Sequence, residues 1–169
     1  VKQISDYCVD FAKQHGLKYR QDEDLNVIIW KDGSKGYEAS EPVILQGHMD
    51  MVAVKEADCD KDMEKEGLDL EINGDYISAK GTSLGGDDGI AVAYTLAVLD
   101  DEEMAHPPIE AIFTVNEEIG MLGAATIDVS DLKGRLFMNM DSEDEGELFI
   151  GCAGGANTVA EYTYQPIAA

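Results

Sequence analysis

A histidine and an aspartate that could bind a metal ion follow an apolar segment early in the chain. Residues 43–46 (VILQ) lead into Gly47, after which His48 and Asp50 stand two positions apart. Side chains two positions apart on an extended chain point in the same direction, so the imidazole and the carboxylate would lie side by side. Such a pair is either a metal or catalytic site or a hydrogen-bonded pair at the surface.

Further acidic residues stand next to other apolar segments, some resembling buried strands and one a buried helix. In open α/β sheets, ligands bind beyond the carboxyl ends of the strands. If the strands of this chain run parallel, one edge of the sheet gathers the following side chains: His48, Asp50, Asp87, Glu117, Glu118 and Asp141.

Each of these carboxylates also has an ordinary structural explanation. Glu117 and Glu118 could begin a helix, where the macrodipole favours negative charge. Asp87 and Asp88 lie in GGDDG, a pattern typical of a turn with a capping Asp, and Asp141 lies in an acidic stretch that could be surface charge. Together, however, many carboxylates at one edge repel one another. Divalent cations relieve that repulsion, and imidazole with carboxylate suits zinc, manganese or cobalt, so the combination predicts a metal site.

Two other features resemble binding sites but are interpreted as structural. Residues 58–69 carry alternating acids like a calcium-binding EF-hand loop, yet Met63 stands where that loop needs glycine and Asp69 where it needs glutamate. His106 precedes two prolines in a loop, and His15 ends the first helix, where a cation is favoured.

The elements that would position these residues follow from hydrophobic patterning and turn signals. The first half of the chain predicts a helix over 1–15 closed by Gly16, a hairpin of strands over 25–30 and 42–46, and a second hairpin turning at Asn73-Gly74. The second half predicts a helix over 89–99 that is apolar all round, as a buried helix would be, and buried strands over 109–115 and 135–140 separated by a helix over 119–127. This alternation predicts an α/β fold with a largely parallel sheet flanked by helices.

The last part of the chain has a different pattern. A strand near 148 and a glycine break at 151–155 precede an alternating strand over 157–164, and the sequence then stops. We expect residues from about 157 onward to leave the sheet that precedes them. A strand with no partner after it suggests that the native chain continues.

Composition limits the possible partners and the environment of the protein. The chain has 169 residues, and 35 acidic against 12 basic residues give a net charge of −23. Nucleic acids and anionic membranes bind basic surfaces, so neither is an expected partner, and the apolar stretch 89–99 is too short to span a bilayer. The cysteines Cys8, Cys59 and Cys152 are odd in number and widely spaced, which favours free thiols in a reducing compartment.

Four motifs taken together resemble a known enzyme family. GHMDMV, GTSLGGDDGIAVAY, TVNEEIGMLGA and NMDSEDEGELFIGCAGG occur in this order and are similar to those of the aminoacyl-histidine dipeptidases, or cytosolic non-specific dipeptidases. These enzymes belong to the aminoacylase/carboxypeptidase group of di-zinc exopeptidases. The resemblance implies that residues 1–155 form the N-terminal part of a di-metal catalytic domain and that residues 156–169 begin a lid or dimerisation domain.

The resemblance also implies a role for each candidate residue and a pair of divalent cations, zinc first and manganese or cobalt as alternatives. His48 would bind one metal, with Asp50 orienting its imidazole; Asp87 would bridge both metals, Asp141 would complete the first, Glu118 would bind the second, and Glu117 would be the general base. The implied reaction is hydrolysis of a dipeptide, of Xaa-His type or of broad specificity, in the cytoplasm by a homodimer that forms through the lid.

One ligand of the family is missing from the sequence. The family needs a second histidine for its second metal, and nothing in residues 1–169 fills that place, nor the lid residues that hold substrate. The chain therefore resembles an N-terminal fragment that we expect to be inactive alone.

Two alternatives remain open from the sequence. An amino-acid deacylase or carboxypeptidase of the same group would share the di-metal residues. A non-catalytic acidic module that only binds cations is the alternative of another class, and it would not need a second glutamate beside the metal ligand Glu118.

Overall fold

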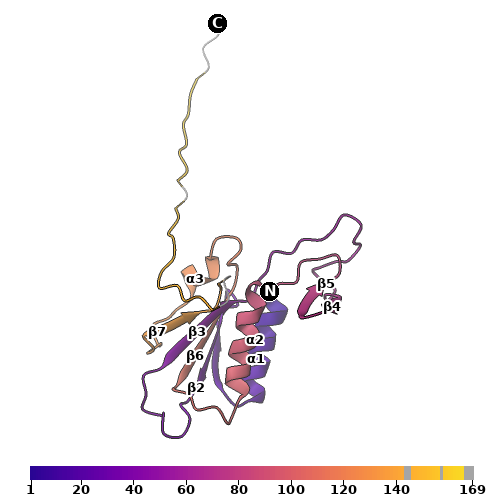
Figure 1. Cartoon of the computed structure of the whole chain (residues 1–169). Coiled ribbons are helices and arrows are strands. Elements are labelled where there is room, and N and C mark those ends of the chain that lie inside the picture. Colours follow the sequence, from indigo (N-terminus) through magenta and orange to yellow (C-terminus); the bar gives the residue numbers. More distant parts are fainter. Residues whose placement is uncertain (143–145, 157, 166–169) are drawn as a thin grey trace.

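The computed structural model describes residues 1–142, 146–156 and 158–165, and its main body is a five-stranded sheet with two long helices on one face (Figure 1). The strands lie in the order β1 (Lys18–Gln21), β2 (Val27–Lys31), β6 (Ile109–Thr114), β3 (Val43–His48) and β7 (Leu136–Asn139). β3 runs parallel to both β6 and β7, whereas β2 is antiparallel to β1 and β6. The predicted α/β class is confirmed as a mixed sheet flanked by helices, and the three parallel strands end at one edge.

The predicted hairpin between the second and third strands is wrong. Val27 of β2 pairs with Phe113, and Val43 of β3 pairs with Ile109, so β6 lies between the two strands. The segment 32–42 is longer than the usual hairpin loop, which allows the fully buried strand β6 to take the central position. The hairpin in this region joins β1 to β2. The polar sequence KYRQ of β1 gave no strand signal.

The two long helices pack on the same face of the sheet. α1 (Lys2–Gln14) buries Cys8, Val9 and Ala12 against β2, and it ends before Gly16, whose φ is +64°. α2 (Gly86–Asp100) covers β3 and β6. The predicted helices are therefore present where expected, and the core lies between them and the sheet.

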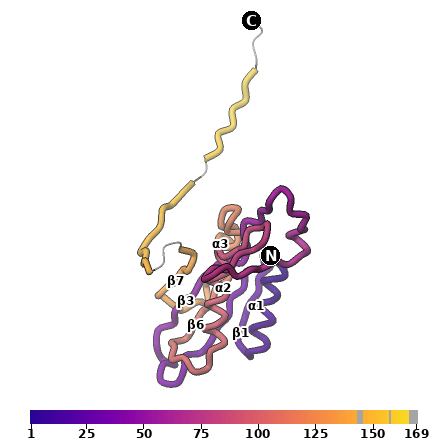
Figure 2. Tube along the Cα trace, turned by 45° about the vertical axis from the view of Figure 1, so that its right-hand side comes forward, coloured from indigo at the N-terminus to yellow at the C-terminus, as the bar shows by residue number. Residues whose placement is uncertain are grey.

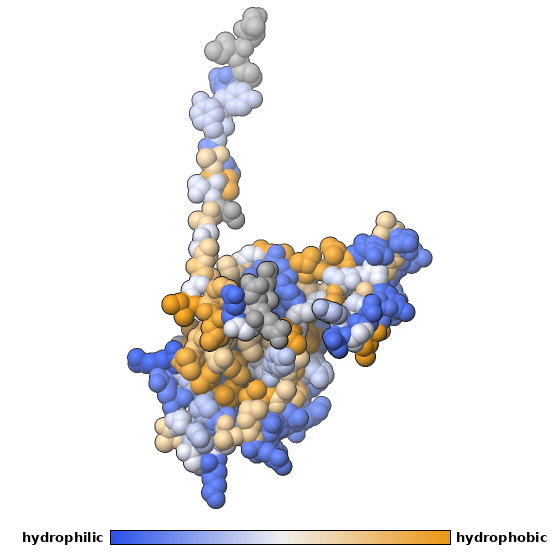
Figure 3. Space-filling model, viewed as in Figure 1, coloured by the Kyte–Doolittle hydropathy of each residue, from blue (hydrophilic) through white to orange (hydrophobic). Residues whose placement is uncertain are grey.

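The prediction that residues 89–99 are buried on all sides is wrong. α2 buries one side, but Ile90 and Tyr94 on the other side are 48% and 60% exposed. α2 rests on the surface of the sheet, so only its inner face meets other described residues. Figure 3 shows apolar side chains on the face where α2 and β7 lie in Figure 1.

Strand β7 is present as predicted but is not buried. Among the described strands it pairs with β3 alone, and Leu136, Phe137 and Met138 are 59%, 54% and 46% exposed. Its start is held by the buried carboxylate of Glu110, which accepts hydrogen bonds from the main-chain N–H groups of Lys133 and Gly134. An apolar strand at the edge of a sheet has the same composition as a central one, so the sequence wrongly predicted that this strand is buried.

The remaining elements agree with the sequence in part. β4 (Leu70–Asn73) and β5 (Tyr76–Ala79) form the second predicted hairpin, with Gly74 at a φ of +63° in the connecting loop. The short helix α3 (Leu122–Thr126) lies within the predicted range 119–127.

The predicted strands in the last part of the chain are not formed. Residues 146–156 and 158–165 contain no helix or strand, and Figure 2 shows this described part of the chain leading away from the sheet. Residue 157, where the second strand was expected to begin, lies outside the described residues. A strand needs a neighbour to take its backbone hydrogen bonds, and the described residues offer none here. The domain boundary at 155/156 stays a prediction.

The three cysteines are free, and their burial gives a test of the packing of α1. Burial raises the pKa of the Cys8 thiol to about 12, whereas Cys152 is exposed. We expect iodoacetamide at pH 8 to alkylate Cys152 at least ~100-fold faster than Cys8, because the thiolate is the reactive form. Peptide mass spectrometry measures both rates, and denaturation in urea should remove the difference. Equal rates in the native protein would contradict the packing.

Candidate metal centre

Four segments bring one imidazole and several carboxylates to the same edge of the sheet. His48 ends β3, Glu117 and Glu118 follow β6, Asp141 follows β7, and Asp87 lies in the first turn of α2. The parallel pairing of β3 with β6 and β7 is what brings the strand ends together. The structure thus shows the convergence that the sequence predicted, although the roles of these residues are matters for proposal.

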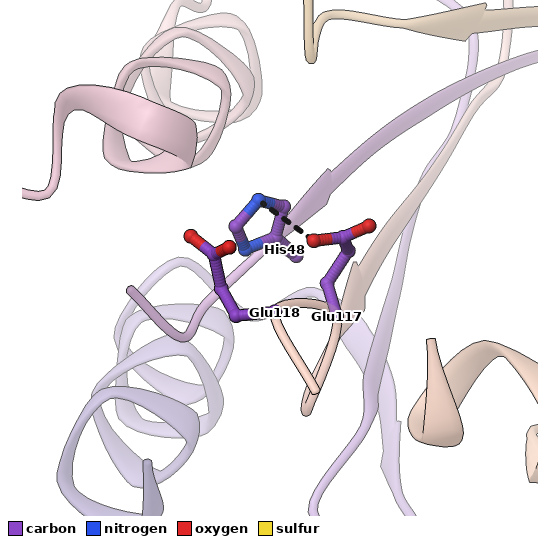
Figure 4. Close-up of side chains that lie close together, drawn as sticks. All are labelled: His48, Glu117 and Glu118. Atoms are coloured by element: carbon purple, nitrogen blue, oxygen red, sulfur yellow. Dashed lines mark ion pairs between the residues drawn. The ribbon is translucent and has the colours of Figure 1, made fainter. Parts of the chain in front are cut away.

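His48 is the centre of the arrangement. Its side chain is 1% exposed, and its Nε2 lies 3.0 Å from Asp87 Oδ1, 3.9 Å from Glu117 Oε2 and 4.0 Å from Asp141 Oδ2. Two sets of potential ligands share this imidazole, His48 with Asp87 and Asp141, and His48 with Glu117 and Glu118, and within each set the ligand atoms lie within 4.8 Å of one another. Figure 4 shows the two glutamates on either side of the imidazole.

Asp50 holds both the histidine and the glutamates. The His48 Nδ1 lies 2.9 Å from the Asp50 main-chain oxygen and 3.6 Å from its carboxylate. The carboxylate instead accepts hydrogen bonds from the main-chain N–H groups of Glu117 (3.1 Å) and Glu118 (3.2 Å). The shorter contact of the imidazole is therefore with the main-chain oxygen of Asp50 and not with its carboxylate. Sequence reasoning missed its contact with the glutamate loop, because no local pattern links residues so far apart.

Asp88 is a further site residue that the sequence did not distinguish from its neighbour Asp87. It is 1% exposed, and its Oδ2 accepts a hydrogen bond from the main-chain N–H of His48 at 3.1 Å. Burial raises the pKa of the Asp88 carboxyl to about 6. A Cβ on Gly47 would lie 2.8 Å from Asp88 Oδ2 and 2.6 Å from the Ala91 side chain. The glycine before His48 was the signal that another group approaches the strand here.

The surrounding charges change the proton affinities of His48 and Glu117. Burial opposes protonation of His48, but the bond to Asp87 and the charges of Asp88, Asp50 and Asp141 outweigh it and raise the pKa of the imidazole. Burial, followed by the nearby carboxylates, raises the pKa of Glu117, with the imidazole acting in the opposite direction. Glu117 is thus more basic than an ordinary glutamate.

The donor set fits a divalent cation. Within the described part of the chain, the ion pairs of Asp50, Asp87, Glu117 and Asp141 are all made with His48, so no lysine or arginine there neutralises these carboxylates. One imidazole nitrogen among carboxylate oxygens is the ligand chemistry of zinc, manganese and cobalt. A cation would supply the missing positive charge.

The two other histidines lie elsewhere. His15 stacks on Phe11, with ring centroids 4.2 Å apart, and its Nδ1 lies 3.4 Å from Asp100 Oδ1. His106 is 6% exposed, and its Nδ1 is 2.7 Å from the main-chain oxygen of Pro107. These contacts agree with their interpretation as structural residues.

Comparison with known proteins identifies what the chain is similar to. No family model matches it. It is 42% identical over 154 residues to the cytosol non-specific dipeptidase of Escherichia coli (strain K12), across 91% of this chain and 32% of that relative. The crystal structure of aminoacylhistidine dipeptidase from Vibrio alginolyticus matches with a TM-score of 0.85 and 42% identity, across 89% of this chain and 31% of that one. The chain is similar to part of a dipeptidase.

The resemblance expected from the four motifs is thereby confirmed. The chain spans about a third of the length of these dipeptidases. Aminopeptidase PepT from Bacillus cereus shares the fold with a TM-score of 0.62 and 26% identity, across 81% of this chain and 38% of that one. In the described residues, no helix has the length and apolar character needed to cross a membrane.

The raised pKa of His48 gives a testable pH dependence. A histidine must be neutral to bind a metal, so a cation at this site competes with the proton for the His48 imidazole. Because the pKa lies above its ordinary value of 6.5, we expect zinc affinity to fall as the pH drops from 8 to 6, with proton release on binding. Calorimetry in buffers of different ionisation enthalpy measures both quantities. His48→Ala should abolish tight binding, and His15→Ala is the matched control; equal affinities for the two variants would contradict the site.

Proposed function

We propose that this chain supplies the metal-binding part of a dipeptidase that uses two divalent cations, zinc being the expected metal. The observation that carries the proposal is the buried His48 imidazole with carboxylates from three other segments around its Nε2. The similarity to two dipeptidases supports the choice of reaction. The chain covers about a third of those proteins, and the activity is therefore proposed for a longer protein that would include it.

The residues divide into ligands, a base and supports. His48, Asp87 and Asp141 would hold the first cation, while Asp87 and Glu118 would hold the second with a histidine from outside this chain. When bound, such cations polarise a carbonyl group and make water more acidic.

Glu117 is suited to moving the proton. Its Oε2 lies 3.9 Å from the His48 Nε2, and its raised pKa brings it nearer to the range of an effective general base. It would take a proton from the attacking water and pass it to the leaving amine. Asp50 keeps Glu117 in place by accepting the hydrogen bond from its main-chain N–H.

The remaining parts of the proposal follow the relatives. The substrate would be a dipeptide, of Xaa-His type or of broad specificity, in line with the names of both dipeptidases. A cytoplasmic location follows the name of the E. coli relative, and a homodimer formed through a lid domain follows the family resemblance.

An amino-acid deacylase or carboxypeptidase of the same group is a second candidate function. The same site residues would serve it, and the likeness to an aminopeptidase shows that this fold occurs in peptidases of other specificity. Assays of N-acylated amino acids beside dipeptides separate these reactions.

Glu117→Gln distinguishes a hydrolase from a module that only binds cations. In the full-length protein, we expect this variant to lose ~100- to 10,000-fold in kcat, the usual contribution of a general base, while zinc content stays unchanged. Asp131→Asn, which removes a surface carboxylate paired with Arg20, is the control. Normal turnover of Glu117→Gln would remove this residue from the mechanism.

The 169-residue chain alone should hydrolyse dipeptides slowly or not at all. The first site would have three protein ligands, the number found in catalytic zinc sites. The second site would lack its histidine, and the lid residues that hold the substrate would also be missing. Positioning groups can account for ~7–11 kcal/mol of a barrier. Calorimetric zinc titration and a dipeptide assay test both expectations, and two tight sites with efficient turnover would contradict them.

A further inference from the structure

The loop that carries the two glutamates is closed by one buried asparagine. Asn26, which precedes β2, is 1% exposed. Its Oδ1 accepts a hydrogen bond from the Val115 N–H at 3.1 Å, and its Nδ2 donates to the Gly123 main-chain oxygen at 3.2 Å. Val115 ends the chain segment before the loop and Gly123 follows the loop, so a single side chain joins the two ends.

The backbone completes this bracket. The Gly123 N–H donates to the Val115 oxygen at 3.0 Å. The remaining N–H of Val115 and C=O of Gly123 are the groups that bind the Asn26 amide, so Asn26 and this backbone bond together form a bracket around the loop. Between them, Asn116 and Met121 have φ values of +55° and +56°. Asparagine tolerates this left-handed region, whereas it is uncommon for methionine and is kept by the surrounding structure. The loop conformation therefore depends on contacts at its two ends.

The contact at Gly123 leaves no room for a side chain. A Cβ there would lie 2.4 Å from Asn26 Oδ1 and 2.4 Å from the Val115 oxygen. Asn26 is itself fixed by Asp22, whose Oδ2 accepts a hydrogen bond from Nδ2 at 2.8 Å and whose Oδ1 accepts one from the Asn26 main-chain N–H at 2.8 Å. Both hydrogens of the Nδ2 group and the Oδ1 oxygen thus have partners, and this sets the orientation of the amide.

We propose that Asn26 is a positioning residue for Glu117 and Glu118, acting through the 115–123 loop from a place outside the metal centre. Its described side-chain hydrogen bonds go to Asp22, Gly123 and Val115, and it lies on a different element from every proposed ligand. Together with Asp50, which binds the Glu117 and Glu118 N–H groups, it fixes where the two carboxylates stand relative to His48. The expected effect of Asn26 on metal binding rests on the proposed metal function, whereas its hydrogen bonds to the loop do not.

Two variants disturb the bracket from opposite sides. Asn26→Asp keeps the shape of the side chain but replaces the Nδ2 donor by an oxygen facing the oxygens of Gly123 and Asp22. Gly123→Ala inserts a methyl group between Asn26 and Val115. Ser5→Ala is the matched control, because it removes two hydrogen bonds of a buried hydroxyl, one to the Leu25 oxygen and one from the Gln21 side-chain amide, and neither involves the loop.

The first measurement needs no metal. Amide hydrogen exchange by NMR on the 169-residue chain should show that the Glu117 and Glu118 amides exchange at least about fivefold faster in both variants, the factor that corresponds to one lost hydrogen bond. Ser5→Ala should leave their exchange relative to the core amides unchanged. In the unmodified chain, the amides of Val115, Glu117 and Glu118 should exchange through one common opening. Independent openings, or unchanged exchange in the folded variants, would overturn the proposal.

The second measurement connects the bracket to the cation. Replacing a supporting residue outside the ligand shell lowers metal affinity by about 10- to 100-fold, and we expect Asn26→Asp to weaken Co²⁺ binding, read from visible absorption, by about tenfold. In a Glu117→Gln/Glu118→Gln background the same substitution should change the affinity less than about twofold, because its effect passes through the glutamates. An equal loss in both backgrounds would show a general structural role and overturn the proposal. Failure of the unmodified chain to bind Co²⁺ would instead overturn the metal function, and hydrogen exchange would still decide the role of Asn26.

Discussion

Negative charge gathered around one buried imidazole is the constraint on which this structure depends. Carboxylates from separate segments lie close to His48, and the described ion pairs of Asp50, Asp87, Glu117 and Asp141 go to that imidazole alone. Such a cluster is unfavourable without a cation. The fold therefore has to hold these side chains in place by other contacts, and the hydrogen bonds of Asp50 and Asp88 to main-chain N–H groups are the clearest of them.

These supports share one design, in which a carboxylate or amide side chain binds the backbone of a distant segment. Asp50 binds the glutamate loop, Asp88 binds the strand end at His48, and Asn26 joins Val115 to Gly123. Each such group is buried or nearly so, and burial makes an unpaired polar group costly. The groups that hold the site residues are therefore shielded from water, which could otherwise replace their hydrogen-bond partners.

The sequence predicted the site better than it predicted the sheet. Apart from Asp87, which lies in the first turn of the apolar helix α2, the candidate side chains follow apolar strands. Parallel strands bring such positions to one edge, so the convergence on His48 needed only local patterns. The order of strands was not available in this way. β2 and β3 are consecutive in the chain, yet β6 lies between them, because a strand whose residues are all buried takes the centre of the sheet. The contacts of Asp50 and Asn26 with the glutamate loop span long sequence separations, and no pattern in the sequence signals them.

Because β7 is exposed, the three proposed ligands of the first site are not held in place equally firmly. His48 ends β3, which has neighbours on both sides. Asp141 follows β7, which has one neighbour among the described strands and three half-exposed apolar side chains. Local unfolding begins where few contacts are lost, so fraying of β7 would remove this proposed ligand first. In the proposed site, the residence time of a cation would then depend on the opening of one short strand, and a contact that covered the outer edge of β7 would slow metal release without touching a ligand.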